Sequence, residues 1–333
     1  RMTVEHPFAQ YVRIIGKGPN LSRPLTGDEM FEAATMIMKG EVEPLQLGAF
    51  LCILRMRTEV PEEGAGFVRA VRDTLEKPTD MPEVDLDWSS YSGKKRQLPW
   101  FLLAVQLMAA NGIRIFMQGT EGHTPDRIYT REALQVLGVP VADSLSEAAD
   151  HIRNSNFAFL PLAKLSPVLQ DIIDLKPVLG LRSPVNTFGR MVNPFGAPHE
   201  IQTVFHPNYR DVHRDTANLL GQKHMAVFKG EGGEVERRPQ KPVLVQSLHN
   251  GELSEEEWPA LLGEDTVEVD EDMDLGRLKS VWSGAEEDTY ATAAITGTVG
   301  IVLRLLGRAD SPAEAMEKAQ TMWQSRDTSR FGA

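Results

Sequence analysis

Apolar positions follow helical spacing through the first 76 residues of the chain. The stretch LTGDEMFEAATMIMKG begins with Thr26 and Glu29, which have the residue types and the spacing of a capping box. Apolar residues recur every three or four positions there and in LQLGAFLCILRMR and EEGAGFVRAVRDTLE, and no strand pattern interrupts them. The pattern predicts a small all-helical domain, followed by a proline-containing linker at 79–83.

From about residue 84 the pattern changes to short apolar runs that alternate with helical stretches. Strands are predicted at 113–119, 157–162 and 224–232, PVLVQSLHNGEL predicts a further strand and turn, and two helices close the chain. This alternation is typical of an α/β domain with a mostly parallel sheet covered by helices. Ligands of such sheets bind beyond the carboxyl ends of the strands. The corresponding loops are 89–97, 117–127 and 229–237.

The net charge of −12 is unevenly distributed over the 333 residues. Residues 252–288 contain fourteen Asp and Glu against Arg277 and Lys279, a local balance of −12, so the remainder is close to neutral. We expect this acidic stretch to be a solvated, partly flexible surface segment that does not exclude a polyanionic partner elsewhere. The one cysteine, Cys52, lies in an apolar helical run and is expected to be a packed thiol.

Targeting signals are not evident in the sequence. No signal peptide opens the chain, and no apolar run approaches the roughly 20 residues of a membrane span. We therefore expect a cytoplasmic protein.

The strongest local signal is a run of three cations, Lys94, Lys95 and Arg96. It follows the Ser/Gly turn of 89–93 and precedes LPWFLLAVQLMAANG, which predicts a buried helix running to Gly112. Cations at the positive end of a helix are unfavourable by roughly 0.3–1 kcal/mol each, so three of them there need a nearby anion. The turn adds hydroxyls and backbone N–H groups of the kind that hold phosphate. The run predicts an anion-binding loop; the alternative is a structural contact with the acidic stretch 252–288.

Motifs for other chemistry do not occur. The eight histidines show no metal-binding spacing, and the sequence contains neither a P-loop, GxxxxGK[ST], nor a nucleophile elbow, GxSxG. The catalytic residues therefore remain unknown at the level of sequence motifs. Further cations fall in or near predicted loops: Arg127, Arg131, Lys164, Lys176, Arg182, Arg190, Lys229, Arg237 and Arg238.

Several segments, in the same order along almost the whole chain, resemble the anthranilate phosphoribosyltransferase family, which has the class-II nucleoside-phosphorylase-like transferase fold. These segments are GEVEPLQLGAFLCILRMRTEVPEE, TREALQVLGV, LGLRSPVNTFGRMVNPFGAP and AVFKGEGGEVE. The resemblance implies a helical domain formed by 1–80 and completed by about 160–185, and an α/β domain formed by 81–159 and 186–333. It also implies a homodimer that associates through the helical domains.

The chain departs from this family where the family binds diphosphate and magnesium. The family's Gly-Thr-Gly-Gly-Asp loop corresponds to SSYSG here, its Asn-Ile-Ser-Thr to PWFL, and its Lys-His-Gly-Asn to MQGT at 117–120. The family's magnesium-binding Asp-Glu pair corresponds to Glu234 and Val235. Because valine has no oxygen donor, only Glu234 and, one residue further on, Glu236 are weak candidates for metal ligands.

These departures resemble a divergent branch of the family, the YbiB-like proteins, in which a Tyr-x-Gly turn and a basic pair replace the diphosphate loop. That branch implies binding of DNA or RNA without sequence specificity, in a basic interdomain groove, with no cofactor. The alternative is an active transferase with an altered, phosphorylated small-molecule substrate and Mg²⁺, with Lys164, Arg182 and Asn186 on its acceptor side. The residues predicted to bind phosphate are Ser92, Gly93, Lys94, Lys95, Arg96, Gln118, Gly119, Thr120, Arg127, Lys164, Lys176, Arg182 and Asn186.

Overall fold

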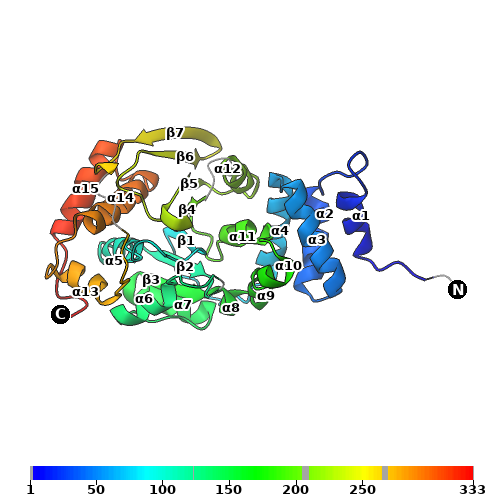
Figure 1. Ribbon diagram of the computed structural model, residues 1–333, viewed down its shortest axis with the longest axis horizontal. Coiled ribbons are helices and arrows are strands. Elements are labelled where there is room, and N and C mark those ends of the chain that lie inside the picture. The colour runs from blue at the N-terminus through cyan, green and yellow to red at the C-terminus, as the bar shows by residue number, and fades with distance from the viewer. Residues whose placement is uncertain (1–2, 123, 205–209, 265–268, 333) are drawn as a thin grey trace.

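A computed structural model describes residues 3–122, 124–204, 210–264 and 269–332. Its N-terminal part is a helical bundle at one end of the molecule (Figure 1). Helix α2 begins at the predicted capping box: the Glu29 N–H donates to the Thr26 hydroxyl at 3.1 Å, and the Thr26 N–H donates to the Glu29 carboxylate at 2.9 Å. The bundle helices are α1 (Ala9–Gly16), α2 (Gly27–Met38), α3 (Pro44–Arg57) and α4 (Pro61–Asp73).

The rest of the described chain is built on a seven-stranded sheet with the strand order β3-β2-β1-β4-β5-β6-β7. Neighbours from β3 to β5 pair in parallel, whereas β6 pairs antiparallel with β5 and β7. The predicted fold class, a helical domain with a mostly parallel α/β domain, is confirmed. The strands are β1 (Leu86–Ser90), β2 (Ile115–Gly119), β3 (Phe157–Pro161), β4 (His199–Thr203), β5 (His224–Phe228), β6 (Val243–His249) and β7 (Glu252–Trp258).

Strand β4 was not predicted. Its sequence, HEIQT, has no apolar run, because Glu200 and Gln202 alternate with Ile201. All three side chains are nevertheless buried between the neighbouring strands and helices. The burial of these polar side chains is a tertiary effect that a period-two hydrophobic pattern does not reveal.

Helices cover both faces of the sheet, and the strands alternate between two cores (Figure 1). In β2, Ile115 and Met117 pack into the core that includes α5 and α14, whereas Phe116 packs into the core shared with the helical bundle. On the first side lie α5 (Phe101–Ala110), α6 (Thr130–Leu137), α13 (Gly276–Ser283), α14 (Thr289–Leu305) and α15 (Pro312–Gln324). The second core includes residues of α7 (Leu145–Ser155), α8 (Leu162–Leu165), α9 (Pro167–Ile173) and α11 (Val185–Phe188). Two further helices are α10 (Lys176–Leu179) and α12 (Arg210–Leu219).

The apolar helix α5 lies in the core of the protein. In α5, which starts at Phe101 within the predicted buried helix, every residue from Phe101 to Ala109 is buried. Over the described ranges, no helix is long and apolar enough to cross a membrane.

The acidic stretch 252–288 is more regular than we expected. It opens with the edge strand β7, in which Glu252 and Glu255 are exposed and Trp258 is buried, so the expectation of a partly flexible segment is wrong for these residues. Charged side chains on a sheet edge also disfavour pairing with another chain. Further along, Arg277 forms ion pairs with Asp270, Glu286 and Asp288. The residues 265–268 lie outside the described part of the chain.

Candidate phosphate-binding site

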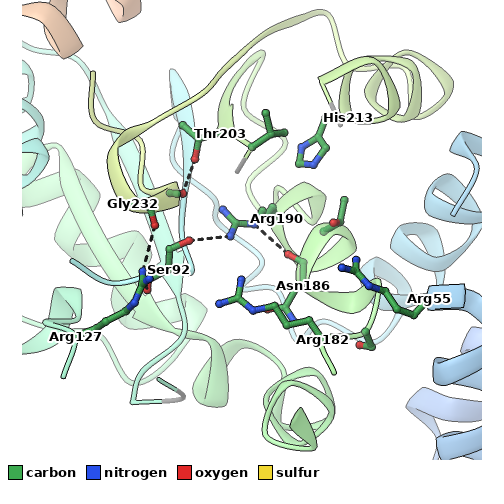
Figure 2. A pocket seen from close by; sticks show the side chains of 13 residues that line it. Arg55, Ser92, Arg127, Arg182, Asn186, Arg190, Thr203, His213 and Gly232 are labelled. Atoms are coloured by element: carbon green, nitrogen blue, oxygen red, sulfur yellow. Dashed lines mark hydrogen bonds between the residues drawn. The ribbon is translucent and has the colours of Figure 1, made fainter. Parts of the chain in front are cut away.

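A cavity of about 450 Å³ lies at the carboxyl ends of the parallel strands, against the helical bundle. Ser92 follows β1, Thr203 ends β4, and Gly232 follows β5 in the short helix η3 (Glu231–Gly233). Arg55 of α3 lines the cavity from the bundle side. The position is the one at which sheets of this type bind ligands. The segment 182–190, with α11, supplies the remaining wall (Figure 2).

Four arginines line this cavity, which we call the arginine pocket, and its lining contains no Asp or Glu. Arg190 is fixed at its base: Nε donates to the Asn186 carbonyl at 3.1 Å, and Nη2 donates to the Ser92 hydroxyl at 3.3 Å. Arg127 Nη1 donates to the carbonyl oxygens of Ser92, Gly93 and Gly232 at 3.1–3.4 Å. These bonds orient two guanidinium groups without neutralising their charge, because their acceptors are uncharged (Figure 2).

The other two arginines have no internal partner. Among the described residues, the guanidinium groups of Arg55 and Arg182 donate no hydrogen bond and form no ion pair. Burial lowers the pKa of Arg182, and the positive charges of Arg127 and Arg55 lower it further. Burial likewise lowers the pKa of Arg190, a shift that the charge of Glu234 opposes. The carboxylate of Glu234 offsets part of the charge of Arg190, and the four arginines together still leave the pocket with net positive charge, which an anion stabilises.

The turn after β1 does not present free N–H groups to this pocket. The backbone N–H groups of Ser92 and Gly93 both donate to Oε1 of Glu234 at 2.8 Å. Gly93 has a φ of 71°, a left-handed conformation that favours glycine and lets successive N–H groups point to one acceptor. This turn has the geometry of an anion-binding nest, and the chain's own carboxylate occupies it.

Lys94 lies in the interior. Its side chain has no exposed surface, and Nζ forms ion pairs with Glu231 and Glu236. Glu236 also accepts from the N–H of Phe101, the first residue of α5, at 2.8 Å. Burial lowers the pKa of Lys94, but the charges of Glu236 and Glu231 outweigh it, so that the net shift is upward. The three side chains form a closed ionic network between the 92–101 loop and the 231–236 segment.

These contacts correct the prediction of an open cationic loop. The run Lys94–Arg96 does not lie at the start of α5, which begins at Phe101, and Lys94 points away from solvent. Lys95 and Arg96 are exposed but do not line the arginine pocket. The alternative, a structural contact with the acidic stretch 252–288, holds for Arg96, whose carbonyl accepts from the Asp270 N–H at 2.9 Å. For Lys94 the acidic partners lie outside that stretch, because they are Glu231 and Glu236.

The predicted residues at 118–120 support the turn from behind instead of lining the pocket. Gln118 is buried; it accepts from the Tyr91 hydroxyl at 2.7 Å and donates to the Gly189 carbonyl at 2.9 Å. A Cβ atom at Gly119 would lie 1.9 Å from the Ser90 carbonyl oxygen, so only glycine fits there. Thr120 donates to the Tyr91 carbonyl at 3.2 Å. The side chains of Gln118 and Thr120 thus hold Tyr91 in place.

Of the other predicted residues, the structure brings Ser92, Arg127, Arg182 and Asn186 together in the arginine pocket. Lys176 does not line the pocket. Burial lowers the pKa of Lys176, and the nearby positive charges of Arg182 and Arg127 lower it further. Lys164 is exposed on α8 and does not line the pocket.

Sequence reasoning missed two of the four arginines as site residues. Arg55 lies in an apolar helical run of the bundle, so nothing local marks it as a ligand, and Arg190 was noted only as a loop cation. It also missed His213 of α12, which is buried beside the pocket with Nδ1 2.7 Å from Oε1 of Gln202. Burial and the charge of Arg190 lower the pKa of His213 to about 3, so the imidazole is neutral at physiological pH.

The two candidate metal ligands have other partners. Glu234 Oε1 accepts the two N–H groups of the turn, and Glu236 accepts from Lys94 and Phe101. Val235 is buried between them. In the described ranges, no three His, Cys, Asp or Glu side chains come together in a group that could hold a metal ion. The donor set around the turn thus does not fit Mg²⁺, which requires several free oxygen ligands in octahedral geometry.

Comparison with protein families assigns both parts of the chain. The helical bundle domain of a glycosyl transferase family matches residues 9–75, and the a/b domain of the same family matches residues 102–327. The chain belongs to this glycosyl transferase family. Residues 76–101, which contain β1 and the turn that Glu234 occupies, lie between the two matched ranges. The segment that departs most from the resembled sequence motifs is therefore also the one that the family comparison leaves out.

Within the glycosyl transferase family, the chain is similar to anthranilate phosphoribosyltransferases, as its sequence indicated. It is 26% identical over 242 residues to that of Paraburkholderia phymatum, which covers 71% of this chain and 69% of the relative. It is 24% identical over 327 residues to an uncharacterized protein of Aquifex aeolicus, 95% and 98% of the two chains. The crystal structure of the Thermus thermophilus enzyme has the same fold, with a TM-score of 0.79 and 20% identity over 96% of this chain and 95% of that one.

Proposed function

We propose that this protein binds nucleic acid through its phosphate groups, in the arginine pocket, without sequence specificity. The observation that carries the proposal is that, among the described residues, four arginines and no carboxylate line one interdomain cavity, and Arg55 and Arg182 have no hydrogen-bond or ion-pair partner. Guanidinium groups form charge-assisted, often bidentate hydrogen bonds with phosphate. Placement within a YbiB-like branch, which implied such a function, stays a prediction.

The composition of the pocket wall favours recognition of phosphate over recognition of bases. Besides the arginines, the lining that the described residues form consists of Ser, Thr, Asn, Gly, Val and His, and no Phe, Tyr or Trp is among these described residues. Proteins that read single-stranded bases usually stack them on aromatic rings. Contacts to phosphate alone position a strand and carry no sequence information.

We also propose that phosphoribosyl diphosphate is not a substrate. Transfer of a phosphoribosyl group requires that the departing diphosphate be stabilised by metal or by hydrogen-bond donors. Here the donors of the turn are bonded to Glu234, and Lys94 is bonded to Glu231 and Glu236. A diphosphate would have to displace a buried carboxylate before it reached these N–H groups.

A second candidate function is an active transferase with an altered substrate. The observation in its favour is that the fold matches, over 98% of this chain and 96% of the other, a Saccharomyces cerevisiae anthranilate phosphoribosyltransferase in complex with phosphoribosyl diphosphate and Mg, with a TM-score of 0.79 and 17% identity. The arginines would then hold the phosphorylated substrate in place of a metal ion. Mg²⁺ would be needed only in this case.

Thermal unfolding with added ligand separates the two functions. A ligand at about a hundred times its dissociation constant adds about 2.7 kcal/mol to the free energy of unfolding. We expect a single-stranded 20-nucleotide oligonucleotide to raise the melting temperature, and phosphoribosyl diphosphate to raise it by the same amount with and without Mg²⁺. A large stabilisation that depends on Mg²⁺ would instead support the transferase.

Exposed apolar side chains of the bundle support the proposal of a homodimer through the helical domains. Leu45 and Met56 of α3 are 88% and 86% exposed, and Val178 of α10 is 78% exposed. Large apolar groups with such exposure mark interaction surfaces when they gather on one part of a protein. Sedimentation velocity should give a species of twice the 37.0 kDa chain mass. The Leu45→Lys/Met56→Lys variant should sediment as a monomer, and a wild-type monomer at micromolar concentration would contradict the dimer.

A further inference from the structure

The four arginines of the arginine pocket lie at different depths. Arg190 is only 9% exposed and forms the base together with Ser92, whereas Arg55 is exposed at the rim. Arg127 and Arg182 are partly buried between them, and Figure 2 shows the guanidinium groups of Arg182 and Arg190 in the same space. The base is closed by the turn after β1 and by η3, which Arg127 bonds together. Arg190 is therefore the most buried of the four guanidinium groups, and Arg55 is the most exposed.

This shape matters for a nucleic-acid strand, because a phosphodiester has chain on both sides. An internal phosphate that reached Arg190 would have to bring a strand segment on each side of it into a cavity of about 450 Å³. A terminal phosphate requires only one. Cavities of about 300–1,000 Å³ are of the size that encloses a small ligand, which here corresponds to the end of a strand.

The charge of the pocket also favours a terminal phosphate over an internal one. A phosphate monoester carries about −1.5 to −2 charges at pH 7 and has three free oxygens, whereas a phosphodiester carries −1. Arg182 and Arg55 offer donors with no internal acceptor in the described part of the chain, and Arg190 and Arg127 have only uncharged acceptors. Four such cations match a dianion better than a monoanion.

We propose that the arginine pocket selects a phosphate monoester, the terminal phosphate of a nucleic-acid strand, over the phosphodiesters within the strand. The proposal rests on the function proposed above, since it names the group that the pocket takes. Selection arises because only the monoester places a second negative charge and a third oxygen among the guanidinium groups. Internal phosphates then contact the exposed rim, where Arg55 lies, and bind more weakly.

Two matched nucleotides test the selection without a strand. Adenosine 5′-monophosphate is a monoester, and adenosine 3′,5′-cyclic monophosphate is a diester with the same base and sugar. Isothermal titration at pH 7.5 should show the monoester binding at least about tenfold more tightly, which corresponds to one strong contact. The ratio should fall as the pH is lowered to 5.5, because the second pKa of the monoester is about 6. The Arg182→Gln variant should lose the preference, whereas Arg308→Gln, an exposed arginine between α14 and α15, should keep it.

Oligonucleotides extend the test to the macromolecule. Three 10-nucleotide thymidine strands, each labelled internally, carry a 5′-phosphate, a 3′-phosphate or two hydroxyl ends, and their affinities are compared by fluorescence anisotropy. We expect each phosphorylated strand to bind about tenfold more tightly than the hydroxyl-ended strand. Equal affinity of the three strands, together with equal affinity of the two nucleotides, would overturn the selection and leave nucleic-acid binding intact. If the nucleotides differ as expected but no strand binds, the selection stands and the proposed nucleic-acid function fails.

Discussion

The Lys94→Ala variant should have a free energy of unfolding about 3–5 kcal/mol lower than that of the wild-type chain. Lys94 is fully buried, and its ammonium group forms ion pairs with both Glu231 and Glu236. Removing one partner of a buried ion pair leaves an uncompensated buried charge, which is the costly case. The loss also frees Glu236 to move, and so weakens the bond that joins the 231–236 segment to the start of α5, where Glu236 accepts from Phe101. Urea unfolding followed by circular dichroism measures the change.

Neighbouring cations supply the control for this prediction. Lys95 and Arg96 are exposed, so Lys95→Ala and Arg96→Ala should change the free energy of unfolding by no more than about 0.5 kcal/mol. If Lys94→Ala does not fold, Lys94→Met combined with Glu236→Gln should recover part of the stability. This double variant removes the carboxylate charge of Glu236 together with the ammonium charge of Lys94. A Lys94→Ala variant as stable as Lys95→Ala would show that the ionic network is not formed in solution.

The Arg127→Gln/Arg182→Gln variant should bind a single-stranded oligonucleotide about a hundredfold more weakly than the wild-type protein at low salt. Each guanidinium group is expected to form a charge-assisted hydrogen bond with phosphate, worth about 1.5–3 kcal/mol. Two such losses sum to about 3–6 kcal/mol, and the lower end of this range is a factor of more than about one hundred in the dissociation constant. Fluorescence anisotropy titration with a labelled 20-nucleotide strand measures it.

Two controls separate this effect from loss of structure and from loss of net charge. The melting temperature of the Arg182→Gln single variant should stay close to that of the wild type, since Arg182 makes no internal hydrogen bond in the described chain. Arg127→Gln loses hydrogen bonds to the Ser92, Gly93 and Gly232 carbonyls, so the double variant should melt at a lower temperature and is titrated well below it. Removing two exposed arginines elsewhere, Arg153 and Arg308, changes the net charge equally and should leave the affinity within about threefold. Equal weakening by both double variants would mean that only the overall charge matters, and not the pocket.

Local sequence signals were sufficient for much of the fold. The capping box at Thr26 and Glu29, the buried helix from Phe101 and the apolar strands β2, β3 and β5 are encoded within a few residues of one another. Strand β4 was not predicted because its buried polar residues, Glu200 and Gln202, have no apolar pattern around them. Burial of a polar side chain is decided by distant parts of the chain.

The difference between local signals and contacts with distant residues also explains which residues of the candidate site were predicted. Arg127 and Arg182 were predicted because they fall in loops of the α/β part, a local property that matches their place in the arginine pocket. Lys94 was predicted to bind phosphate because its charge is evident from the sequence, whereas its partners Glu231 and Glu236 are 137 and 142 residues away. Arg55 reaches the pocket only through packing of the bundle against the sheet. Spacing along the chain does not show which carboxylate a buried cation will contact.

The salt dependence of oligonucleotide affinity tests most directly whether the arginine pocket, and not the 94–96 loop, holds phosphate. The logarithm of the binding constant falls with the logarithm of salt concentration by about 0.7 for each neutralised phosphate of a single strand. The account predicts that Arg127→Gln/Arg182→Gln makes this slope shallower by roughly 0.7–1.4, and that Lys95→Gln/Arg96→Gln leaves it unchanged. A shallower slope for the loop variant, with an unchanged slope for the pocket variant, would contradict it.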